Sequence, residues 1–419
     1  MRRAILAPVV LVAAASAVPA MGQIQFIRLG FLDGTNLESY AWGVSADGTA
    51  VVGESSSLAS GSQTQAFRWV GGTMHGLGAL NPDNFSSVAN ACSADGGVVV
   101  GFSRYTTGVA FQAFRAPGPM INPGDGLGDL PGGALISNAL ACSADGSIVV
   151  GFGTGPSGRQ AFRYNAATGQ MVAIGGAGTT AYGVSADGTV AVGQSLSTVE
   201  AIVWTTDAQG NTSAMVLPDL PGGLVGAEAW GISHNGMIVV GDSESENGLE
   251  ACYWAQGQAF PLGDLPGGVF NSSALASSVD GQVIVGYGSS ASSGFLGEAV
   301  YWDHHGVNSI MDQLVAAGID LQGFDLLVAN GVSADGRVIV GNGTNAQGRP
   351  EAWMVILPAH QDCPFDLNAD GILDPDDLAD FIAGYFMDPP APFTDWDGNT
   401  IIDPDDLADY IAGYFLGCE

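Results

Sequence analysis

GVSADGTAVVG, residues 43–53, is one of seven close copies of the same segment in a chain of 419 residues. Each copy consists of two short strand-like runs, and the runs meet at Asp-Gly or Asn-Gly. These dipeptides accept the positive φ angles of a tight hairpin turn. We therefore expect a β-hairpin at each copy. The copies occupy residues 43–53, 91–101, 141–151, 183–193, 231–241, 277–286 and 331–341.

Two further segments accompany the hairpins. The first is typified by AFRW at residues 66–69, and the second by LGDLPGG at residues 127–133. With the hairpin they give four short strands per unit, and the unit returns about every 50 residues, as the blades of a β-propeller do. The sequence thus predicts a mainly β fold, a seven-bladed β-propeller over residues 23–357. The AFRW-like segments begin at residues 66, 113, 161, 201, 251, 299 and 352.

The two ends of this repeat array are complementary. The last unit ends with EAWMVIL, residues 351–357, and lacks a fourth strand, whereas the first unit is preceded by an extra strand-like run, IQFIRLG at 24–30. If that run completes the last blade, the ring closes without leaving a bare sheet edge. We expect this closure.

The repeats resemble those of the HAF-repeat extracellular proteins. The motif behind that name has the local form QAF at 65–67, 112–114 and 160–162, and its His is replaced here by Gln, Glu or Ala. The resemblance covers about residues 24–357. It implies an exported propeller, and the family has no assigned activity.

The N-terminus has the pattern of a Sec-type signal peptide. Arg2 and Arg3 form a basic region, an apolar run follows over residues 4–15, and small residues come next. We assign residues 1–22 to this peptide. The protein is therefore expected to be exported, and to be extracellular or associated with the cell surface, where disulfides are permitted.

The composition excludes several partners. Ten Arg and no Lys stand against 42 acidic residues, which gives a formal net charge of −32. Such a surface repels nucleic acid and anionic membranes, because binding to phosphate needs clustered cations. Apart from the signal peptide, no run reaches the roughly 18 apolar residues of a membrane span. We expect neither nucleic-acid binding nor membrane insertion.

Near the C-terminus, two segments have the spacing of an EF-hand calcium loop. DLNADGILDPDD at 366–377 has oxygen-bearing residues at loop positions 1, 3, 5, 9 and 12 and Gly371 at position 6. DWDGNTIIDPDD at 395–406 repeats it, with Thr400 at position 6, where a β-branched residue fits poorly. The predicted calcium ligands, with Ile372 and Ile401 acting through their carbonyls, are Asp366, Asn368, Asp370, Ile372, Asp374 and Asp377 in the first loop and Asp395, Asp397, Asn399, Ile401, Asp403 and Asp406 in the second.

Each loop leads into a predicted amphipathic helix. Apolar residues recur at i, i+3, i+4, i+7 and i+8 from Leu378 and again from Leu407. Such paired loop-and-helix units, with Gly417 and Cys418 at the end, resemble a GC-type dockerin domain. The resemblance covers residues 363–419, after a short linker at 358–362, and implies protein–protein docking to a cohesin-like or surface-anchoring partner. Cys363 and Cys418 flank the module, and we predict a disulfide between them.

Within the propeller, several residue types allow two interpretations. The Asp residues of the SADG tips either form turns or ligate metal, and turns are favoured because each tip belongs to a different blade. Four Trp at one strand position pack between blades or form a sugar-stacking platform. Cys92 and Cys142 are buried thiols or an inter-blade bridge, and Cys252 has no evident partner. His304 and His305 are a possible metal pair. The Asp and Trp residues are Asp47, Asp95, Asp145, Asp187, Asp335, Trp69, Trp204, Trp254 and Trp302.

These features favour a non-enzymatic binding or scaffold protein, docked through a calcium-dependent tail. The alternative is a secreted polysaccharide-degrading enzyme with the same tail, although no GxSxG elbow is present. A carbohydrate or protein ligand is expected on the face that bears the DLPGG loops and the long loops after VVG, for example residues 54–65 and 242–250.

Overall fold

The computed structural model divides the chain into two units, one of residues Ile24–Leu357 and one of Met1–Gln23 with Pro358–Glu419. It describes residues 24–33, 37–60, 63–83, 86–104, 110–291, 293, 297–303, 306–358, 375–386, 407, 408, 410, 411 and 414.

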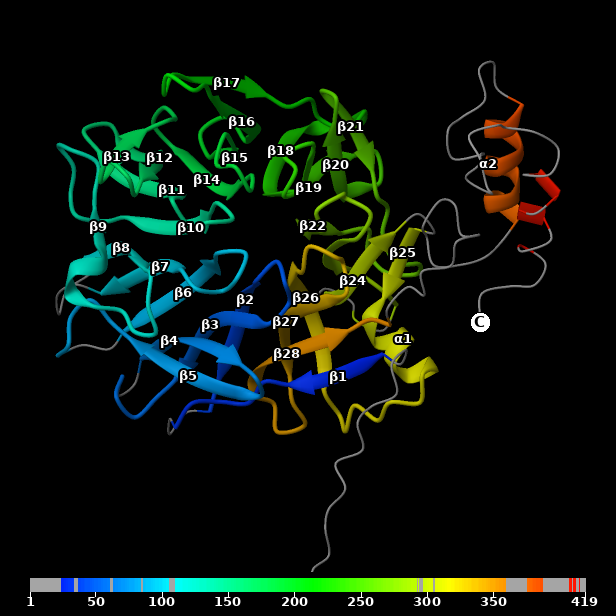
Figure 1. Cartoon of the computed structure of the whole chain (residues 1–419), viewed down its shortest axis with the longest axis horizontal. Helices are drawn as coiled ribbons and strands as arrows, with labels where there is room; N and C mark the ends of the chain where they lie inside the picture. Colours follow the sequence, from blue (N-terminus) through cyan, green and yellow to red (C-terminus); the bar gives the residue numbers. More distant parts are fainter. Residues whose placement is uncertain are drawn as a thin grey trace, which may run out of the picture. The chain divides into compact units, whose positions relative to one another are not determined.

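The unit Ile24–Leu357 is the predicted seven-bladed β-propeller, with seven four-stranded antiparallel sheets around a central axis (Figure 1). Each blade runs outward from an inner strand that ends at an SADG-type tip. Blades one to three are β2(Ser39–Val44), β3(Ala50–Ser56), β4(Thr64–Val70), β5(Thr73–Gly78); β6(Ser87–Cys92), β7(Val99–Arg104), β8(Phe111–Ala116), β9(Gly126–Gly128); β10(Asn138–Cys142), β11(Ile148–Gly155), β12(Gly158–Asn165), β13(Gln170–Ala173).

The remaining blades follow the same order, and a short 3-10 helix, η1(Pro123–Asp125), precedes β9. Blades four to seven are β14(Thr179–Val184), β15(Val190–Ser195), β16(Glu200–Thr206), β17(Thr212–Val216); β18(Gly222–Ile232), β19(Ile238–Ser245), β20(Gly248–Ala255), β21(Gln258–Pro261); β22(Ser273–Ser277), β23(Ile284–Gly288), β24(Glu298–Asp303), β25(Gly306–Ser309); β26(Asp325–Val332), β27(Val338–Thr344), β28(Pro350–Ile356), β1(Gln25–Arg28).

The ring closes as the sequence predicts. Strand β1 pairs antiparallel with β28, from Gln25 opposite Ile356 to Arg28 opposite Trp353, and so becomes the outer strand of the seventh blade. The Arg28 guanidinium reinforces the junction, because its Nε donates to Glu351 Oε1 at 3.0 Å and its second nitrogen reaches Oε2 at 2.5 Å.

The SADG segments form turns, which confirms the first interpretation of their aspartates. Asp47 Oδ1 accepts from the Ser45 hydroxyl at 2.6 Å and from the Thr49 amide at 3.0 Å. The other tips repeat this pattern. Backbone hydrogen bonds also join neighbouring tips, for example from the Ala94 amide to the Ala144 carbonyl at 2.8 Å. They connect six of the seven neighbouring pairs and so make a nearly complete ring around one end of the propeller.

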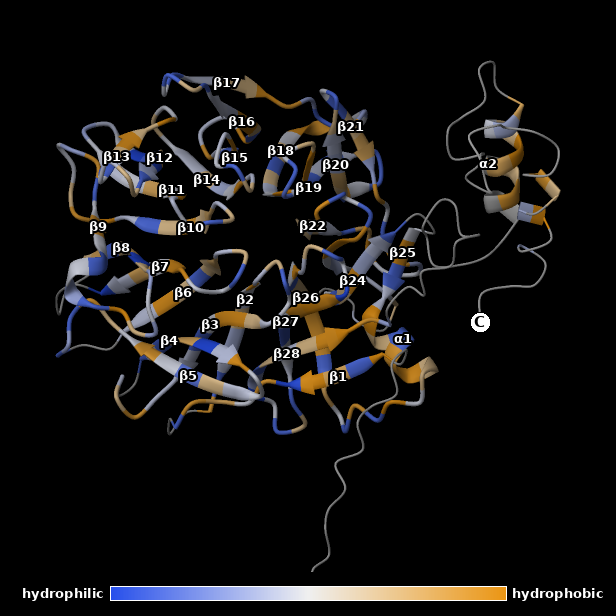
Figure 2. Ribbon diagram, in the orientation of Figure 1, coloured by the Kyte–Doolittle hydropathy of each residue, from blue (hydrophilic) through white to orange (hydrophobic). Residues whose placement is uncertain are grey.

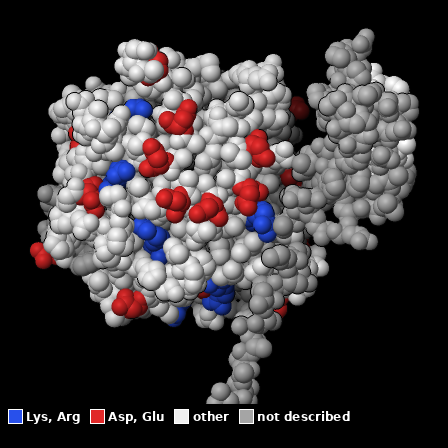
Figure 3. Space-filling view, viewed as in Figure 1, with Lys and Arg blue, Asp and Glu red and all other residues white. Residues whose placement is uncertain are grey.

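The apolar residues of the strands pack between adjacent blades, and Figure 2 shows hydrophobic colouring along many of these strands. Trp204, Trp254 and Trp302 are 1% exposed and Trp69 is 9% exposed, which confirms packing and rules out a stacking platform for them. Acidic and basic side chains are interspersed on the surface seen in Figure 3.

Two named helices complete the described structure. The helix α1(Ile310–Ala316), which the sequence analysis missed, follows β25 and is capped by the Ser309 hydroxyl. The helix α2(Pro375–Tyr385) belongs to the other unit. There the rings of Phe381 and Tyr410 stack, with their centroids 3.8 Å apart and their planes 8° apart. None of the helices in the described residues is long and apolar enough to cross a membrane.

Candidate functional site

Every inner strand carries a β-bulge at the same place. In β2, Ala41 pairs with Gly53 and Gly43 with Val52, so that the residue between them has no partner opposite. A bulge of this kind bends the strand and re-aims one side chain. The bulged residues of blades one to seven are Trp42, Asn90, Leu140, Tyr182, Trp230, Leu275 and Asn330.

The bulge explains why the VVG motif ends in glycine. A Cβ atom on Gly53 would fall well inside 3.0 Å of the Tyr40 carbonyl oxygen across the ladder, a distance that Cβ atoms do not adopt. The equivalent glycine of every other blade meets the equivalent carbonyl in the same way. These glycines do not have positive φ angles, so backbone conformation is not the reason for them. Glycine is required opposite each bulge because a side chain there has no space.

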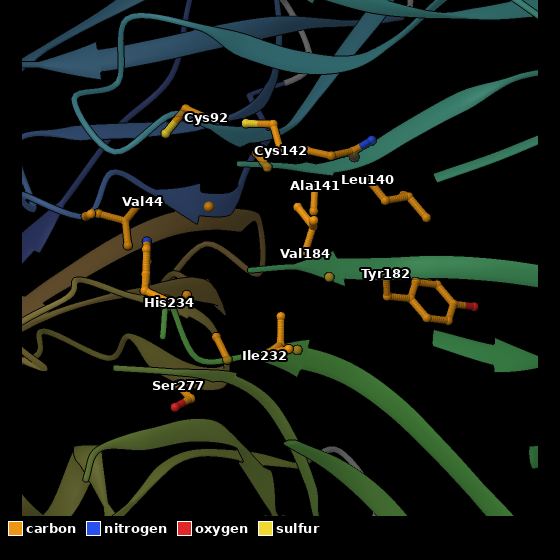
Figure 4. A pocket seen from close by; sticks show the side chains of 18 of the residues that line it. Val44, Cys92, Leu140, Ala141, Cys142, Tyr182, Val184, Ile232, His234 and Ser277 are labelled. Carbon is orange, nitrogen blue, oxygen red and sulfur yellow. The ribbon is translucent and has the colours of Figure 1, made fainter. Parts of the chain in front are cut away.

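The seven bulged residues surround a cavity of about 260 Å³ on the propeller axis. The next residue of each inner strand is only Gly or Ala, whereas the bulged residue differs between blades. Figure 4 shows Leu140 and Tyr182 toward one end of the cavity and Val44 and His234 toward the other, where the hairpin tips lie. Each bulge therefore places one variable side chain at the same mouth of the cavity. We call these seven bulged residues the bulge ring.

Two aromatic rings meet in the bulge ring between the fourth and fifth blades. The ring centroids of Tyr182 and Trp230 lie 4.5 Å apart, with planes tilted by 43°. Trp230 Nε1 donates to Asp242 Oδ2 at 2.7 Å, and the Ser273 hydroxyl donates to the same oxygen at 2.5 Å. Gln194 Nε2 donates to the Tyr182 hydroxyl at 2.7 Å. These bonds fix the orientation of both rings.

The first blade repeats part of this arrangement. Trp42 Nε1 donates to Glu54 Oε1 at 3.3 Å, and Glu54 stands at the same strand position as Asp242. The Trp42 ring stacks on Tyr40 with centroids 5.9 Å apart and planes 10° apart. The pairing of a bulged Trp with the acidic residue after the VVG glycine thus occurs twice around the ring.

The carboxylates at this mouth lack a basic partner. Burial raises the pKa of Asp242, and burial followed by the charge of Asp242 raises the pKa of Glu228. Burial likewise raises the pKa of Glu54. Within the described residues the one salt bridge, between Arg28 and Glu351, lies elsewhere. Within these residues, no ion pair therefore offsets the charge of the carboxylates when they are ionised.

We expect Asp242→Asn to raise the midpoint of thermal unfolding at pH 7. The amide keeps an acceptor for Trp230 and Ser273 but removes a buried charge. Because the folded-state pKa is raised, the ionised carboxylate destabilises the fold above that pKa. The loss of stability caused by the charge disappears as the pH falls from above the folded-state pKa to the pKa of the unfolded chain. The difference in unfolding midpoint between the variant and the wild type should therefore shrink over this pH range.

The matched control is Asp187→Asn. Hydrogen bonds from Ser185 and Thr189 lower the pKa of this turn aspartate, so its charge stabilises the fold and the substitution should not raise the midpoint. Scanning calorimetry at several pH values measures both variants. Equal losses of stability would contradict the account of Asp242.

Many residues named in the sequence predictions lie outside the described residues. These include the signal peptide, most of the linker, Cys363 and Cys418, the ligands from Asp366 to Asp374 and from Asp395 to Asp406, and His304 and His305. Asp377 falls within α2. In the described part, no group of three or more His, Cys, Asp or Glu could hold a metal ion.

The propeller cysteines are free thiols. Cys92 and Cys142 stand at equivalent positions of β6 and β10 and line the cavity, and neither is bridged. Burial raises the pKa of Cys142 to about 12 and raises that of Cys92 further. The pair is thus unbridged, as the first interpretation holds, but the two side chains are half-buried, and only Cys252 of the three is fully buried.

The sequence analysis missed the bulge ring. Trp42, Tyr182 and Trp230 each stand three residues before the serine of an SADG-type tip, and the repeat made that position seem unimportant because its residue changes between copies. The change of residue at this position, next to a position that is always Gly or Ala, was the signal in the sequence that could have revealed the bulge ring.

Comparisons with known proteins do not identify the chain. No family model and no curated protein matches it. Among solved structures it is similar to TolB from Acinetobacter baumannii, with 14% identity and a TM-score of 0.41 over 62% of this chain and 64% of that one.

Two further solved structures are similar in the same degree. They are the Kuenenia stuttgartiensis hydrazine synthase, with 13% identity, a TM-score of 0.44 and coverage of 74% and 93%, and the Xanthomonas campestris gluconolactonase XC5397, with 12% identity, a TM-score of 0.38 and coverage of 81% and 91%. At these identities and TM-scores, none of the likenesses says what this chain binds or does.

Proposed function

We propose that this protein is an exported, non-enzymatic propeller that binds its ligand at the bulge ring, and that a calcium-dependent dockerin-like module attaches it to a surface or matrix partner. The observation that carries the binding function is the recurrent bulge, because seven separate strands each turn one variable side chain toward the same mouth. Bulges that re-aim side chains are typical of functional sites.

The position of the ring agrees with the expected binding face. The inner strand enters from the side of the long loops and leaves at the SADG tip, so the loops after VVG and the DLPGG segments share one side of the propeller. A ligand at the ring would therefore lie beneath the loops where binding residues usually occur. The high thiol pKa of Cys92 and Cys142 also disfavours a cysteine nucleophile in the cavity.

The test is a ligand panel of oligosaccharides and peptides, screened by the rise in unfolding midpoint. A triple variant with Trp42, Tyr182 and Trp230 replaced by Ala should lose every midpoint shift that the wild type shows. A control variant with the exposed outer-strand residues Val172 and Met215 replaced by Ala should keep the midpoint shifts of the wild type. Shifts that persist in the triple variant would place the site elsewhere, and chromatographic detection of cleaved oligosaccharide would favour the polysaccharide-degrading alternative.

A further inference from the structure

We propose that the sector of the bulge ring formed by Tyr182, Trp230 and Asp242 binds an organic ammonium group. The inference rests on the proposed binding function and names its ligand chemistry. Its first support is geometric: the Tyr182 and Trp230 rings line the cavity with their centroids 4.5 Å apart, and the buried carboxylate of Asp242, which does not itself line the cavity, accepts a hydrogen bond from Trp230 Nε1. An ammonium over an aromatic face beside a carboxylate is attracted by both.

The second support is an unused acceptor. Gln194 is 3% exposed, and its Oε1 has no hydrogen-bond partner, although its Nε2 is bonded to the Tyr182 hydroxyl. If the amide were turned over, its other polar atom would be left without a partner instead. Leaving a buried polar atom unpaired costs free energy, and such atoms in native structures call for an explanation. The hydroxyl of Thr180, the cross-strand partner of Gln194, is also buried without a partner. A ligand that donates hydrogen bonds at the Tyr182 hydroxyl end of the sector would satisfy the Gln194 oxygen.

The third support is the balance of donors and acceptors. Both hydrogen bonds to Asp242 go to Oδ2, so within the described residues Oδ1 accepts none. Trp230 Nε1 and Ser273 Oγ each donate their one hydrogen to Asp242, and one of the two Gln194 Nε2 hydrogens goes to Tyr182. The sector therefore offers the acceptor Oδ1 and the charge of the carboxylate, while its remaining donors are the hydroxyls of Tyr182 and Thr180 and one N–H of Gln194. A sugar hydroxyl both donates and accepts, whereas an ammonium only donates.

The surrounding charges favour the same ligand. Glu228 is the cross-strand partner of Asp242 and adds a second carboxylate, and Glu244 follows two residues along β19. The charge of Arg159 reaches Tyr182, but its guanidinium is stacked 3.8 Å over the Phe152 ring. The Trp42 and Glu54 pair of the first blade offers a similar but more open arrangement, since Trp42 is 37% exposed.

The experiment uses the full chain and n-butylammonium, followed by saturation-transfer NMR and calorimetry at constant ionic strength. Neutral n-butanol has nearly the same shape and tests the charge. We expect saturable binding of the ammonium, and about tenfold weaker binding to Asp242→Asn, which keeps the acceptor for Trp230. Trp230→Leu should weaken binding similarly. Glu244→Gln removes one charge from the same strand and should change the affinity less than about twofold.

Three outcomes would overturn the inference. Equal losses in Asp242→Asn and Glu244→Gln would indicate general attraction to an acidic surface. Equal binding of n-butanol would indicate an apolar pocket. Cellobiose binding that Trp230→Leu abolishes, without binding of the ammonium, would replace the ammonium by a sugar and leave the proposed binding function intact. Failure of the bulge-ring triple variant to affect any ligand is a separate result, which counts against the proposed function itself.

Discussion

Gly151→Ala is expected to destabilise the propeller by about 3 kcal/mol or more, although it adds a single methyl group. Gly151 stands opposite the bulge of β10, and a Cβ there would overlap the Asn138 carbonyl oxygen and approach Ala139 Cα to 3.1 Å. Backbone atoms on a paired inner strand cannot move aside cheaply. The variant must therefore lose the bulge or open the ladder. Urea unfolding followed by tryptophan fluorescence measures the loss.

Gly124→Ala is the matched control. Gly124 lies within η1, its backbone φ is not positive, and a Cβ there meets nothing within 4 Å. Alanine restricts the unfolded chain more than glycine does, so this variant should be neutral or slightly more stable. If both variants behaved alike, crowding opposite the bulge would not be the reason for the VVG glycine.

Removing calcium is expected to unfold the C-terminal module and to leave the propeller intact. The helix α2 has 11 residues, which is short of the length at which an isolated helix is stable in water, about 12 to 15 residues. The buried rings of Phe381 and Tyr410 stack on each other. Without the ion, we expect the acidic loops to crowd several carboxylates together, with a repulsion that two short helices cannot offset.

Hydrogen exchange of the full chain with mass spectrometry measures this effect. With EDTA, the amides of α2 should exchange at least about tenfold faster, while those of β28 stay unchanged. Asp370→Ala should produce the same loss in calcium, and Asp403→Ala a smaller one, because we expect the second loop, with Thr400 at position 6, to bind the ion more weakly. Asp335→Asn, in a propeller turn, is the control. Protection of α2 that is insensitive to EDTA in oxidised and reduced samples would remove calcium from the proposal.

The fold was predictable because its information is local and repeated. The Asp-Gly tips set the hairpins, and the spare strand at Ile24–Gly30 matched a missing strand after residue 357, so that the blade number and the closure by β1 followed from the sequence. The turn role of Asp47 was predictable for the same reason, since its bonds to Ser45 and Thr49 join neighbours in the chain.

The candidate site was not predictable, because it arises from pairings distant in the sequence. Because every copy of the repeat contains the bulge, the extra residue does not make any copy longer than the others. Nothing in the sequence therefore marks Trp230 as an unpaired residue. Its partner Asp242 comes from another strand, and Ser273, which also donates to Asp242, comes from another blade. Tyr182 approaches Trp230 because neighbouring inner strands converge on the axis, and that convergence exists only after the ring has closed.

The seam between the two ends of the propeller has a mechanical consequence. A pull applied through the chain beyond residue 357 enters the propeller at β28, which is the third strand of its blade and not an edge. This strand is paired on one side with β27 from Val338 to Thr344 and on the other with β1 from Gln25 to Arg28. A tethering force therefore cannot peel away a free edge strand, and it must break two hydrogen-bonded ladders and the Arg28–Glu351 ion pair together.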